Sequence, residues 1–474
     1  MNAATAAPRL HSSLEWLNAE PQSIEAHRGR VVALVFWNAG SVYCHNLMEQ
    51  MSTLRARYPL ALTVLGVHQP RFDAEVAGRT VLGAANRLDV TFPVANDRGW
   101  VTWQHYGIYH WPSVALIDPL GNLRGIHYGD DQLAAIDAEV ATLIEEVNGV
   151  TTPPPEDERP RNAEPRQALS FPSGVVATDG HLYVADTGHH RVLECTFEGR
   201  VLRQFGNGHA ALVDGNPTEA AFNRPRGLCV MRDWLYVADS ANHAIRRVHL
   251  LDGTVETVLG NGRAGVPKEG RYPQPGECQV NQPWAVAGGN DRIYIAAAGN
   301  NQVWELEMGT RYLRFVAGTS ELGIADGPGR NAMFGQPAGL ALVAQALYVV
   351  DSVTSALRVV QLQASTVQTL VGQGLYEFGE NDGSRGVARL QYPLGVALDP
   401  SAPVLWVADA YNGTLRKLRL GGGEVTTHAL PHALSQPTAL AMGGGALWIA
   451  DAAAHEVLRH DLNTGLLVRV PVGE

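Results

Sequence analysis

Five aspartates end the same kind of short apolar string at widely separated places in the chain. Aspartate carboxylates can bind Ca²⁺ where several converge, or they can accept hydrogen bonds from the turn that follows a strand. A side chain that recurs in nearly every copy of a repeat serves the repeat itself, so we favour turn capping over a metal site. The five residues are Asp186, Asp239, Asp351, Asp409 and Asp451, and a sixth copy of the string ends in Ala297 instead.

Histidines and arginines recur at fixed distances from these aspartates. A His lies four residues after the Asp in three copies, and side chains spread over separate repeats are too far apart to share a metal ion. An Arg lies seven residues after the Asp in three copies. These arginines either form a basic arc on one face, open to a protein or anionic partner, or pair with neighbouring carboxylates. The residues are His190, His243 and His455, and Arg246, Arg358 and Arg416.

The four cysteines, Cys44, Cys195, Cys229 and Cys278, are scattered along the chain. They are too few and too far apart for a disulfide framework, and no Cys-x-x-Cys pair indicates a zinc site. This usage is typical of a reducing compartment. We therefore expect no metal and no other cofactor.

The aspartate strings belong to a long internal repeat. LYVAD at 182–186 returns as LYVAD, IYIAA, LYVVD, LWVAD and LWIAD, and each copy follows a Pro. The spacings between those prolines are 53, 58, 54, 56 and 44 residues. A third apolar strand begins in fixed register six residues after each Asp position, and several copies add a fourth strand. Four antiparallel strands per copy predict a six-bladed β-propeller with contiguous blades, closed by packing of the last blade against the first.

A glycine lies two residues after the repeat proline in four copies. Equal placement in several repeats predicts a backbone requirement at that point. The four residues are Gly174, Gly227, Gly339 and Gly395.

The first third of the chain has a different sequence pattern, in which apolar runs alternate with helical segments. An apolar run at 31–37, a helical pattern at 42–58, a second apolar run at 61–67 and a closing helical pattern at 131–147 predict an α/β domain. The segment 151–166 reads TTPPPEDERPRNAEPR, in which proline and charge leave almost nothing apolar to bury. We predict an α/β domain at 1–150, a linker at 151–166 and the propeller at 167–474.

The overall charge argues against nucleic acid as a partner. The 474 residues contain 36 basic and 47 acidic side chains, a net charge of −11, whereas phosphate binding needs a concentrated positive surface. The N-terminal 20 residues lack a basic region followed by an apolar run, and no stretch reaches the length of a membrane span. We expect a cytoplasmic protein that contacts no membrane.

The repeat resembles the NHL family. Three segments between blades carry Asp-Gly and end in a hydrophobic-x-x-Pro-x-Gly pattern, and ANHAIRRV at 241–248 is also typical. The resemblance implies a propeller that binds a protein or peptide. Some NHL propellers use His in the central channel for metal-dependent chemistry, so a channel enzyme is an alternative. The three segments begin at Asp214, Asp326 and Asp382.

The first domain resembles the thioredoxin-like group, nearest to its redoxin branch. The strand at 31–37 leads to the position of that group's Cys-x-x-Cys, and YGIYHWPSVALIDPLGNL at 106–123 resembles its proline loop, strand and turn. By this resemblance Pro112 is the cis-proline that faces the active site. The combined order, a thioredoxin-like fold followed by an NHL propeller, is similar to that of the NHL-repeat-containing protein 2 family.

The Cys-x-x-Cys window is degenerate here. Ser41 takes the nucleophilic position, and serine cannot exchange disulfides, so we expect no dithiol oxidoreductase activity. The favoured interpretation makes Ser41 a helix N-cap and Cys44 a small core residue. A second makes Cys44 a lone redox or sensing thiol with His45 nearby. A third keeps the surface around Trp37, Cys44 and Pro112 as a peptide-binding groove. The main functional hypothesis is therefore a protein-binding scaffold; the oligomeric state is left open.

Overall fold

The computed structural model describes residues 5–146, 167–178 and 180–473. Two compact units divide the chain, Met1–Arg166 and Gln167–Glu474. The linker predicted at 151–166 lies outside the described residues. Each unit has its own hydrophobic core and is described by itself.

The first unit is built on a seven-stranded sheet of order β1-β7-β6-β3-β4-β5-β2. β3 is central, runs parallel to β4 and antiparallel to β6, and is buried along its whole length. Its uninterrupted apolar sequence is the pattern of a strand covered on both faces. The strands are β1 (Thr5–Ala6), β2 (Glu15–Trp16), β3 (Val31–Trp37), β4 (Leu62–His68), β5 (Val94–Asn96), β6 (Ser113–Ile117) and β7 (Asn122–Tyr128).

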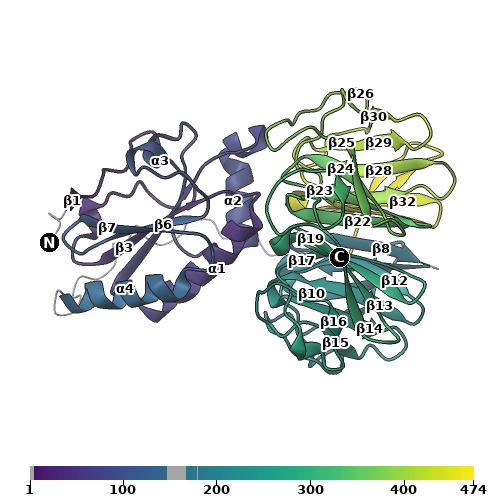
Figure 1. Ribbon diagram of the computed structural model, residues 1–474, viewed down its shortest axis with the longest axis horizontal. Coiled ribbons are helices and arrows are strands. Elements are labelled where there is room, and N and C mark those ends of the chain that lie inside the picture. The colour runs from purple at the N-terminus through teal and green to yellow at the C-terminus, as the bar shows by residue number, and fades with distance from the viewer. Residues whose placement is uncertain (1–4, 147–166, 179, 474) are drawn as a thin grey trace. The chain divides into compact units, whose positions relative to one another are not determined.

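Four α-helices cover the two faces of this sheet. Side chains of α1, α2 and α4 share one core with the odd-numbered residues of β3, and α3 packs with the N-terminal segment on the opposite face. Figure 1 shows α3 on one side of the sheet and α1 with α4 on the other. This arrangement confirms the predicted thioredoxin-like fold. The helices are α1 (Val42–Arg57), α2 (Gly78–Arg87), α3 (Val101–His105) and α4 (Leu133–Glu146), with 3-10 turns η1 (Glu25–His27) and η2 (Asp73–Val76).

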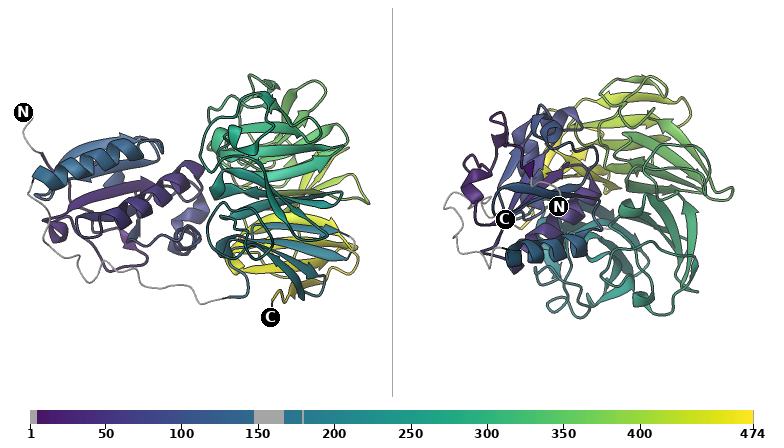
Figure 2. Two further views of the ribbon diagram at one scale, coloured as in Figure 1. Left: turned by 90° about the horizontal axis from the view of Figure 1, so that it is seen from below. Right: turned by 60° about the vertical axis from the view of Figure 1, so that its left-hand side comes forward.

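The second unit is the predicted six-bladed propeller. Each sheet is formed by strands consecutive in sequence, so the blades are contiguous (Figures 1 and 2). Blade one contains β8 (Gly174–Thr178), β9 (His181–Asp186), β10 (Arg191–Thr196) and β11 (Val201–Phe205). Blade two contains β12 (Pro225–Met231), β13 (Trp234–Asp239), β14 (Ala244–His249) and β15 (Val255–Leu259). Blade six contains β31 (Pro437–Gly443), β32 (Ala446–Asp451), β33 (Glu456–Asp461) and β34 (Leu467–Val470).

Blades three, four and five each have a fifth, two-residue strand on the outer edge, where the sequence predicted four strands. In blades four and five this strand begins at the Gly of an Asp-Gly pair, and the same pairing occurs in blade two as a single bridge from Gly215 to Val255. Blade three contains β16 (Gly270–Arg271), β17 (Pro283–Gly289), β18 (Arg292–Ala297), β19 (Gln302–Glu307) and β20 (Tyr312–Ala317). Blade four contains β21 (Gly327–Pro328), β22 (Pro337–Val343), β23 (Ala346–Asp351), β24 (Ala356–Gln361) and β25 (Thr366–Val371). Blade five contains β26 (Gly383–Ser384), β27 (Gly395–Leu398), β28 (Val404–Asp409), β29 (Thr414–Arg419) and β30 (Glu424–His428).

The ring closes by packing of blade six against blade one, as predicted. Leu169 and Val175 of the first blade share a core with Trp448 and Ala450 of the last. The Thr438 hydroxyl donates a hydrogen bond to the Pro172 carbonyl at 3.1 Å. No strand is exchanged between the two blades in the part of the chain that the structure describes.

The repeated glycines are required by close approach between neighbouring inner strands. A Cβ built on Gly174 would lie 2.0 Å from the Arg226 carbonyl oxygen of the next blade, and one on Gly227 would lie 2.6 Å from Ala285 Cα. Atoms at these distances overlap, so a side chain would push two blades apart. The backbone requirement predicted from the repeat therefore has a steric cause.

Candidate functional site

The Ser-x-x-Cys window forms the first turn of α1. Ser41 is the N-cap in an extended conformation, and its hydroxyl accepts a hydrogen bond from the Cys44 amide at 3.4 Å. Cys44 is fully buried and packs with the core of the sheet. The structure thus places both residues where the favoured interpretation of the sequence predicted them.

The Cys44 thiol is held in its neutral form. Burial raises the pKa of this thiol to about 12, against the opposing effect of the Asn38 amide, which donates a hydrogen bond to Sγ at 3.2 Å. The Nε2 of His45 lies 2.8 Å from the Ala39 carbonyl oxygen. At pH 7 a thiol of this pKa is ionised to only about one part in 10⁵.

The residues predicted to line a peptide groove lie below the surface. Trp37 is 0% exposed, and its ring meets that of His68 edge-on at 5.2 Å. Pro112 is buried and follows a cis peptide bond from Trp111, the conformation that the resemblance implied. Among these neighbours Ser41 and Trp111 are half-buried and reach solvent. A partner of this region would therefore touch Ser41 and Trp111 rather than Trp37.

A buried carboxylate supports this site, and no sequence signal marked it. Glu75 is 0% exposed, and its Oε2 accepts hydrogen bonds from the Asn38 side chain and the Arg71 amide, both at 2.7 Å. The Asn38 side-chain amide also donates to the Gln69 carbonyl at 2.9 Å. These bonds tie the turn before α1 to the segment after β4. They fix the position of Ser41 and Cys44 without contacting the sulfur.

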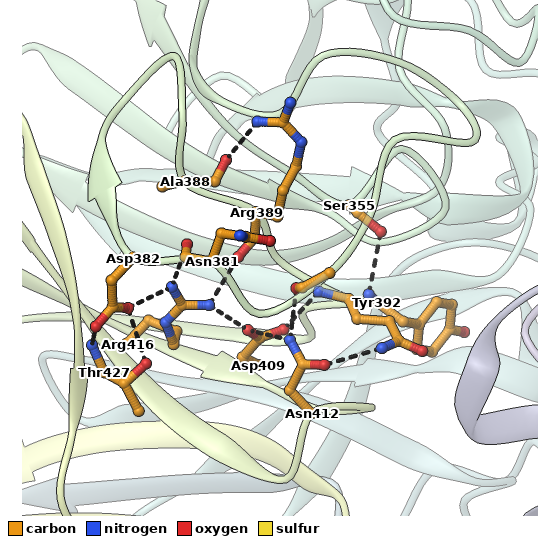
Figure 3. A network of polar contacts seen from close by, with 12 residues as sticks. Ser355, Asn381, Asp382, Ala388, Arg389, Tyr392, Asp409, Asn412, Arg416 and Thr427 are labelled. Carbon is orange, nitrogen blue, oxygen red and sulfur yellow. Dashed lines mark hydrogen bonds and ion pairs between the residues drawn. The ribbon is translucent and has the colours of Figure 1, made fainter.

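In the propeller, the repeated arginines are inside the blades. Arg416 is 1% exposed and lies between two carboxylates, 2.9 Å from Asp409 and 2.7 Å from Asp382 (Figure 3). Asp382 also accepts hydrogen bonds from the Thr427 hydroxyl at 2.8 Å and the Thr427 amide at 3.0 Å. The guanidinium further donates to the carbonyl groups of Asn381 and Arg389. This network joins the third strand of blade five to the Asp-Gly segment on its edge.

The same network occurs in blades two and four. Arg246 lies 2.8 Å from Asp239 and 2.7 Å from Asp214, and Arg358 lies 3.7 Å from Asp351 and 2.9 Å from Asp326. Both guanidinium groups are 0% exposed, and each lies close to a Phe ring. The predicted basic arc on a propeller face is therefore corrected: pairing with carboxylates, the other possibility, accounts for Arg246, Arg358 and Arg416.

The repeated aspartates have the predicted structural role and, in addition, a second partner that the sequence did not indicate. Four of the five carboxylates bind a side chain of the turn that follows the strand, from His189, Asn242, Thr354 or Asn412. Each carboxylate also accepts a backbone amide hydrogen bond from the segment that leads into its own blade, 15 to 18 residues upstream. In blade three, which has Ala297, the Asn300 side chain accepts the corresponding bond from Asn281 at 3.0 Å. The pairs are Asp186 with Ser170, Asp239 with Asn223, Asp351 with Gly335, Asp409 with Gln391 and Asp451 with Ser435 and Gln436.

The repeated histidines link one blade to the next. Nδ1 of His243 accepts a hydrogen bond from the Gln282 amide at 3.1 Å, and burial lowers the pKa of this imidazole to about 4. His190 accepts likewise from Arg224, and His455 closes the ring by accepting from Phe171, both at 3.2 Å. Each histidine thus serves a separate junction.

Small and apolar residues line the central channel. Its walls come from the inner strands of all six blades and contain Gly174, Gly227, Ala285, Gly339 and Gly395. The lining residues carry no His, Cys, Asp or Glu, and no cluster of three such side chains occurs among the residues that the structure describes. Nothing in this lining favours the alternative of a channel metal enzyme.

Comparison with known proteins agrees with this architecture. A family model of the NHL repeat matches residues 169–195, which span β8, β9 and all but the last residue of β10 in blade one. NHL repeat-containing protein 2 of chicken (Gallus gallus) is 30% identical to this chain, over 98% of the chain and 71% of the relative. The chain belongs to the NHL repeat-containing protein 2 family.

Two other similar proteins match different shares of this chain. The Arabidopsis thaliana protein SUPPRESSOR OF QUENCHING 1, chloroplastic, is 31% identical over 98% of this chain, which spans 47% of that protein's length. Thioredoxin-like protein YneN of Bacillus subtilis is 29% identical over 25% of this chain and 67% of its own length. The first relative matches nearly the whole chain, whereas the match to the second covers only a quarter of it.

Proposed function

We propose that this chain is a protein-binding scaffold in which the propeller recruits a partner and the thioredoxin-like unit adds a contact without dithiol chemistry. The observation that carries the proposal is the state of the Ser-x-x-Cys site. Thiol–disulfide exchange needs an accessible thiolate at the first position and a second thiol to resolve the mixed disulfide. Here Ser41 caps the helix and Cys44 is a buried neutral thiol.

The propeller supports the same proposal from a different direction. The side chains that suggested metal or anion binding are committed to holding blades together, through Arg416 and its two carboxylates or His243 and the next blade. Rigid blades with differing loops are a common platform for protein recognition. The partner's identity is a matter for experiment.

Thiol reactivity of the full chain tests the thioredoxin-like half of the proposal. The native chain is exposed briefly to an oxidised small disulfide at neutral pH, and modification of each cysteine is followed by mass spectrometry. We expect Cys44 to react no faster than the buried Cys195 and Cys278, and half-buried Cys229 to be the internal reference. Selective modification of Cys44 would contradict the proposal.

A capture experiment tests the binding half. The wild-type chain and Cys44→Ser, each carrying the same affinity tag, are crosslinked to partners in cells of the source organism. We expect both to retain the same partner in equal amounts, because the thiol takes no part in binding. Capture lost with Cys44→Ser would favour a mixed-disulfide partner, and no specific capture by either chain would defeat the scaffold proposal.

One observation favours the monothiol alternative. The Asn38 amide donates to Sγ, and Cys44 lies in the first turn of α1, where the helix dipole stabilises a thiolate. If the segments that cover Cys44 moved away while this turn stayed formed, both groups would remain and would favour ionisation of the exposed thiol. A role in redox sensing follows only if the opened form is populated, and the reactivity experiment detects it directly.

Location and ligands remain predictions. None of the described helices has both the length and the apolar character needed to cross a bilayer. A cytoplasmic location, the absence of a cofactor and the exclusion of nucleic acid as a partner rest on the sequence alone. Fractionation of cells that express the tagged full chain checks the first of these.

A further inference from the structure

The six blades differ in how their outer edges are covered. In blades three to five a short strand pairs with the outermost strand, and in blade two a single bridge at Gly215 does the same. In blade six, β34 is the last strand of its sheet among the described residues. An outermost strand presents a row of backbone groups to which an extended peptide can bind.

The side chains on this edge show which peptide it fits. In blades two, four and five an Arg on the third strand is paired across the sheet with a Thr on the fourth, and both bind the Asp of the covering segment. In blade six the equivalent cross-strand pair is Leu458 with Arg469. In blade six the Arg of this pair is therefore on the fourth strand, at the edge of the sheet, rather than on the third.

Arg469 is suited to meet a carboxylate at this edge. In blade five the amide of the equivalent residue, Thr427, donates to Asp382 at 3.0 Å. The Arg469 side chain is 49% exposed and lies 3.3 Å from Glu456, so its guanidinium reaches solvent while held in place. Arg–carboxylate pairs are strong and directional because both groups can form paired hydrogen bonds.

The opposite face of the same strand borders a groove. It has a volume of about 340 Å³ and lies between β34 and the turn of blade one, with Phe197, Val468, Val470 and Pro471 supplying apolar walls. Its charged lining residues are Arg459, Arg469 and Glu198. Arg459 lies 3.9 Å from Asp461 and Arg469 lies 3.3 Å from Glu456, so the lining has no excess of positive charge. The preference for a carboxylate therefore comes from the half-exposed Arg469 guanidinium at the edge, and the apolar walls favour an adjacent hydrophobic side chain.

We propose that β34 binds an extended acidic segment of a partner protein by strand addition. An Asp or Glu of that segment pairs with Arg469, and the next residue, which points to the opposite face of the strand, places an apolar side chain in the groove. The segment imitates the chain's own Asp-Gly strands. This inference rests on the proposed scaffold function and names the chemistry of its partner.

A synthetic peptide tests the proposal on the full chain. The probe copies residues 380–388, the segment that covers blade five, with Asn381→Val and Gly383→Val so that apolar side chains flank the Asp. Binding of the fluorescein-labelled peptide is followed by anisotropy. A second peptide with Asp382→Asn provides the neutral comparison. We expect the neutral peptide to bind about fivefold or more weakly.

Variants of the chain locate the site. Arg469→Glu is expected to weaken binding about tenfold or more, and Arg263→Glu, an equal charge change at an exposed loop, to leave the affinity within about twofold. Leu467→Pro removes an amide donor from the edge strand at a position where proline is tolerated, and should also abolish binding. Unfolding curves identify any variant that fails to fold. In that case Arg469→Ala is used as the variant that tests the role of Arg469.

The outcomes separate this inference from the proposed function. Equal binding by wild type and Arg469→Glu, or no binding of the acidic peptide, overturns strand addition at β34. If the cellular partner is still captured by Arg469→Glu, the scaffold function stands and this edge is not its site. A concentration-dependent dimer that Leu467→Pro disrupts would show that a second copy of the chain occupies the edge, which also overturns the proposal.

Discussion

Arg416 in blade five and Cys44 in the thioredoxin-like unit are both buried residues of types that enzymes use for chemistry. Arg416 is surrounded by two carboxylates and two carbonyl groups. Cys44 has one amide donor at its sulfur and remains neutral because burial raises its pKa. A buried charge depends on its partners, whereas a buried neutral thiol behaves as a small apolar group.

The two regions should also differ in how strongly substitutions lower the stability of the fold. The Arg416 network recurs in three blades and joins strands to the segments that cover them. The Cys44 site occurs once, and its turn is positioned by Glu75 and Asn38 rather than by the thiol. Substitutions in the network should therefore lower the free energy of unfolding strongly, and substitutions of Cys44 should lower it only slightly.

The largest expected effect is that of Arg416→Met. Removing the guanidinium leaves Asp409 buried without its charge partner, which should lower the free energy of unfolding by about 3 to 5 kcal/mol. Urea unfolding of the full chain measures the change. Arg419→Met, an exposed Arg on the same strand, is the control and should change stability by less than about 0.5 kcal/mol. Equal stability of the two variants would show that the network is dispensable.

A side chain placed at the close contact between two inner strands should lower stability by nearly as much. Gly227→Val places a Cβ 2.6 Å from Ala285 Cα and 2.8 Å from the Trp284 carbonyl oxygen, and we expect a loss of about 3 kcal/mol. Thermal unfolding should show a clearly lower melting temperature. Gly386→Val is the matched control, because no atom lies within 4 Å of a Cβ built there. An unchanged melting temperature for Gly227→Val would refute the steric explanation.

Repetition explains how much of the propeller could be predicted. A residue that returns in most blades serves the blade, so the aspartates and glycines could be assigned structural roles from sequence alone. The bond from the following turn could also be predicted, as Asn242 to Asp239 shows. The second partner could not, since the amide of Asn223 lies 16 residues upstream and only the fold brings it to Asp239. One available signal went unused: the Asp-Gly segments and the Arg residues occur in the same three blades, which indicates pairing.

The thioredoxin-like site occurs only once in the sequence, so its residues could not be compared between repeats. A Ser that precedes a helical pattern predicts an N-cap, and the absence of a first Cys excludes dithiol chemistry, so these features could be inferred. Burial of Trp37 and the supporting role of Glu75 depend on how separate elements pack. Glu75 lies far from any motif in the sequence, and only the fold brings it to Asn38.

His243 combines features of both regions: it is half-buried and neutral, and it connects blades as the network does. Its pKa in the folded chain, about 4, is below the ordinary value of 6.5, so the unfolded chain binds the proton more readily. The His243 contribution is therefore complete above pH 6.5 and is lost as the pH falls towards 4. We expect a loss of about 2 kcal/mol across that window, measured by urea unfolding at several pH values.

His243→Asn is the control for this pH dependence. Asn occupies the equivalent position in blade three, where the Asn301 side chain accepts the corresponding hydrogen bond from Gln336 at 2.9 Å. Asn does not titrate, so the variant should keep its stability at pH 7 and lose about 2 kcal/mol less than wild type on acidification. Parallel pH profiles for the two proteins would exclude His243 as the source.

The smallest effect should come from Cys44→Ala. The substitution removes one buried sulfur atom and leaves the Asn38 amide without its acceptor, so we expect a loss of about 1 kcal/mol in urea unfolding of the full chain. Cys195→Ala, at a buried position in the propeller, is the matched control and should behave alike. A loss at Cys44 as large as that of Arg416→Met would mean that the sulfur is held as a partnered thiolate. The two regions would then bury their charged groups in the same way, and the thioredoxin-like site would have to be reconsidered as chemically active.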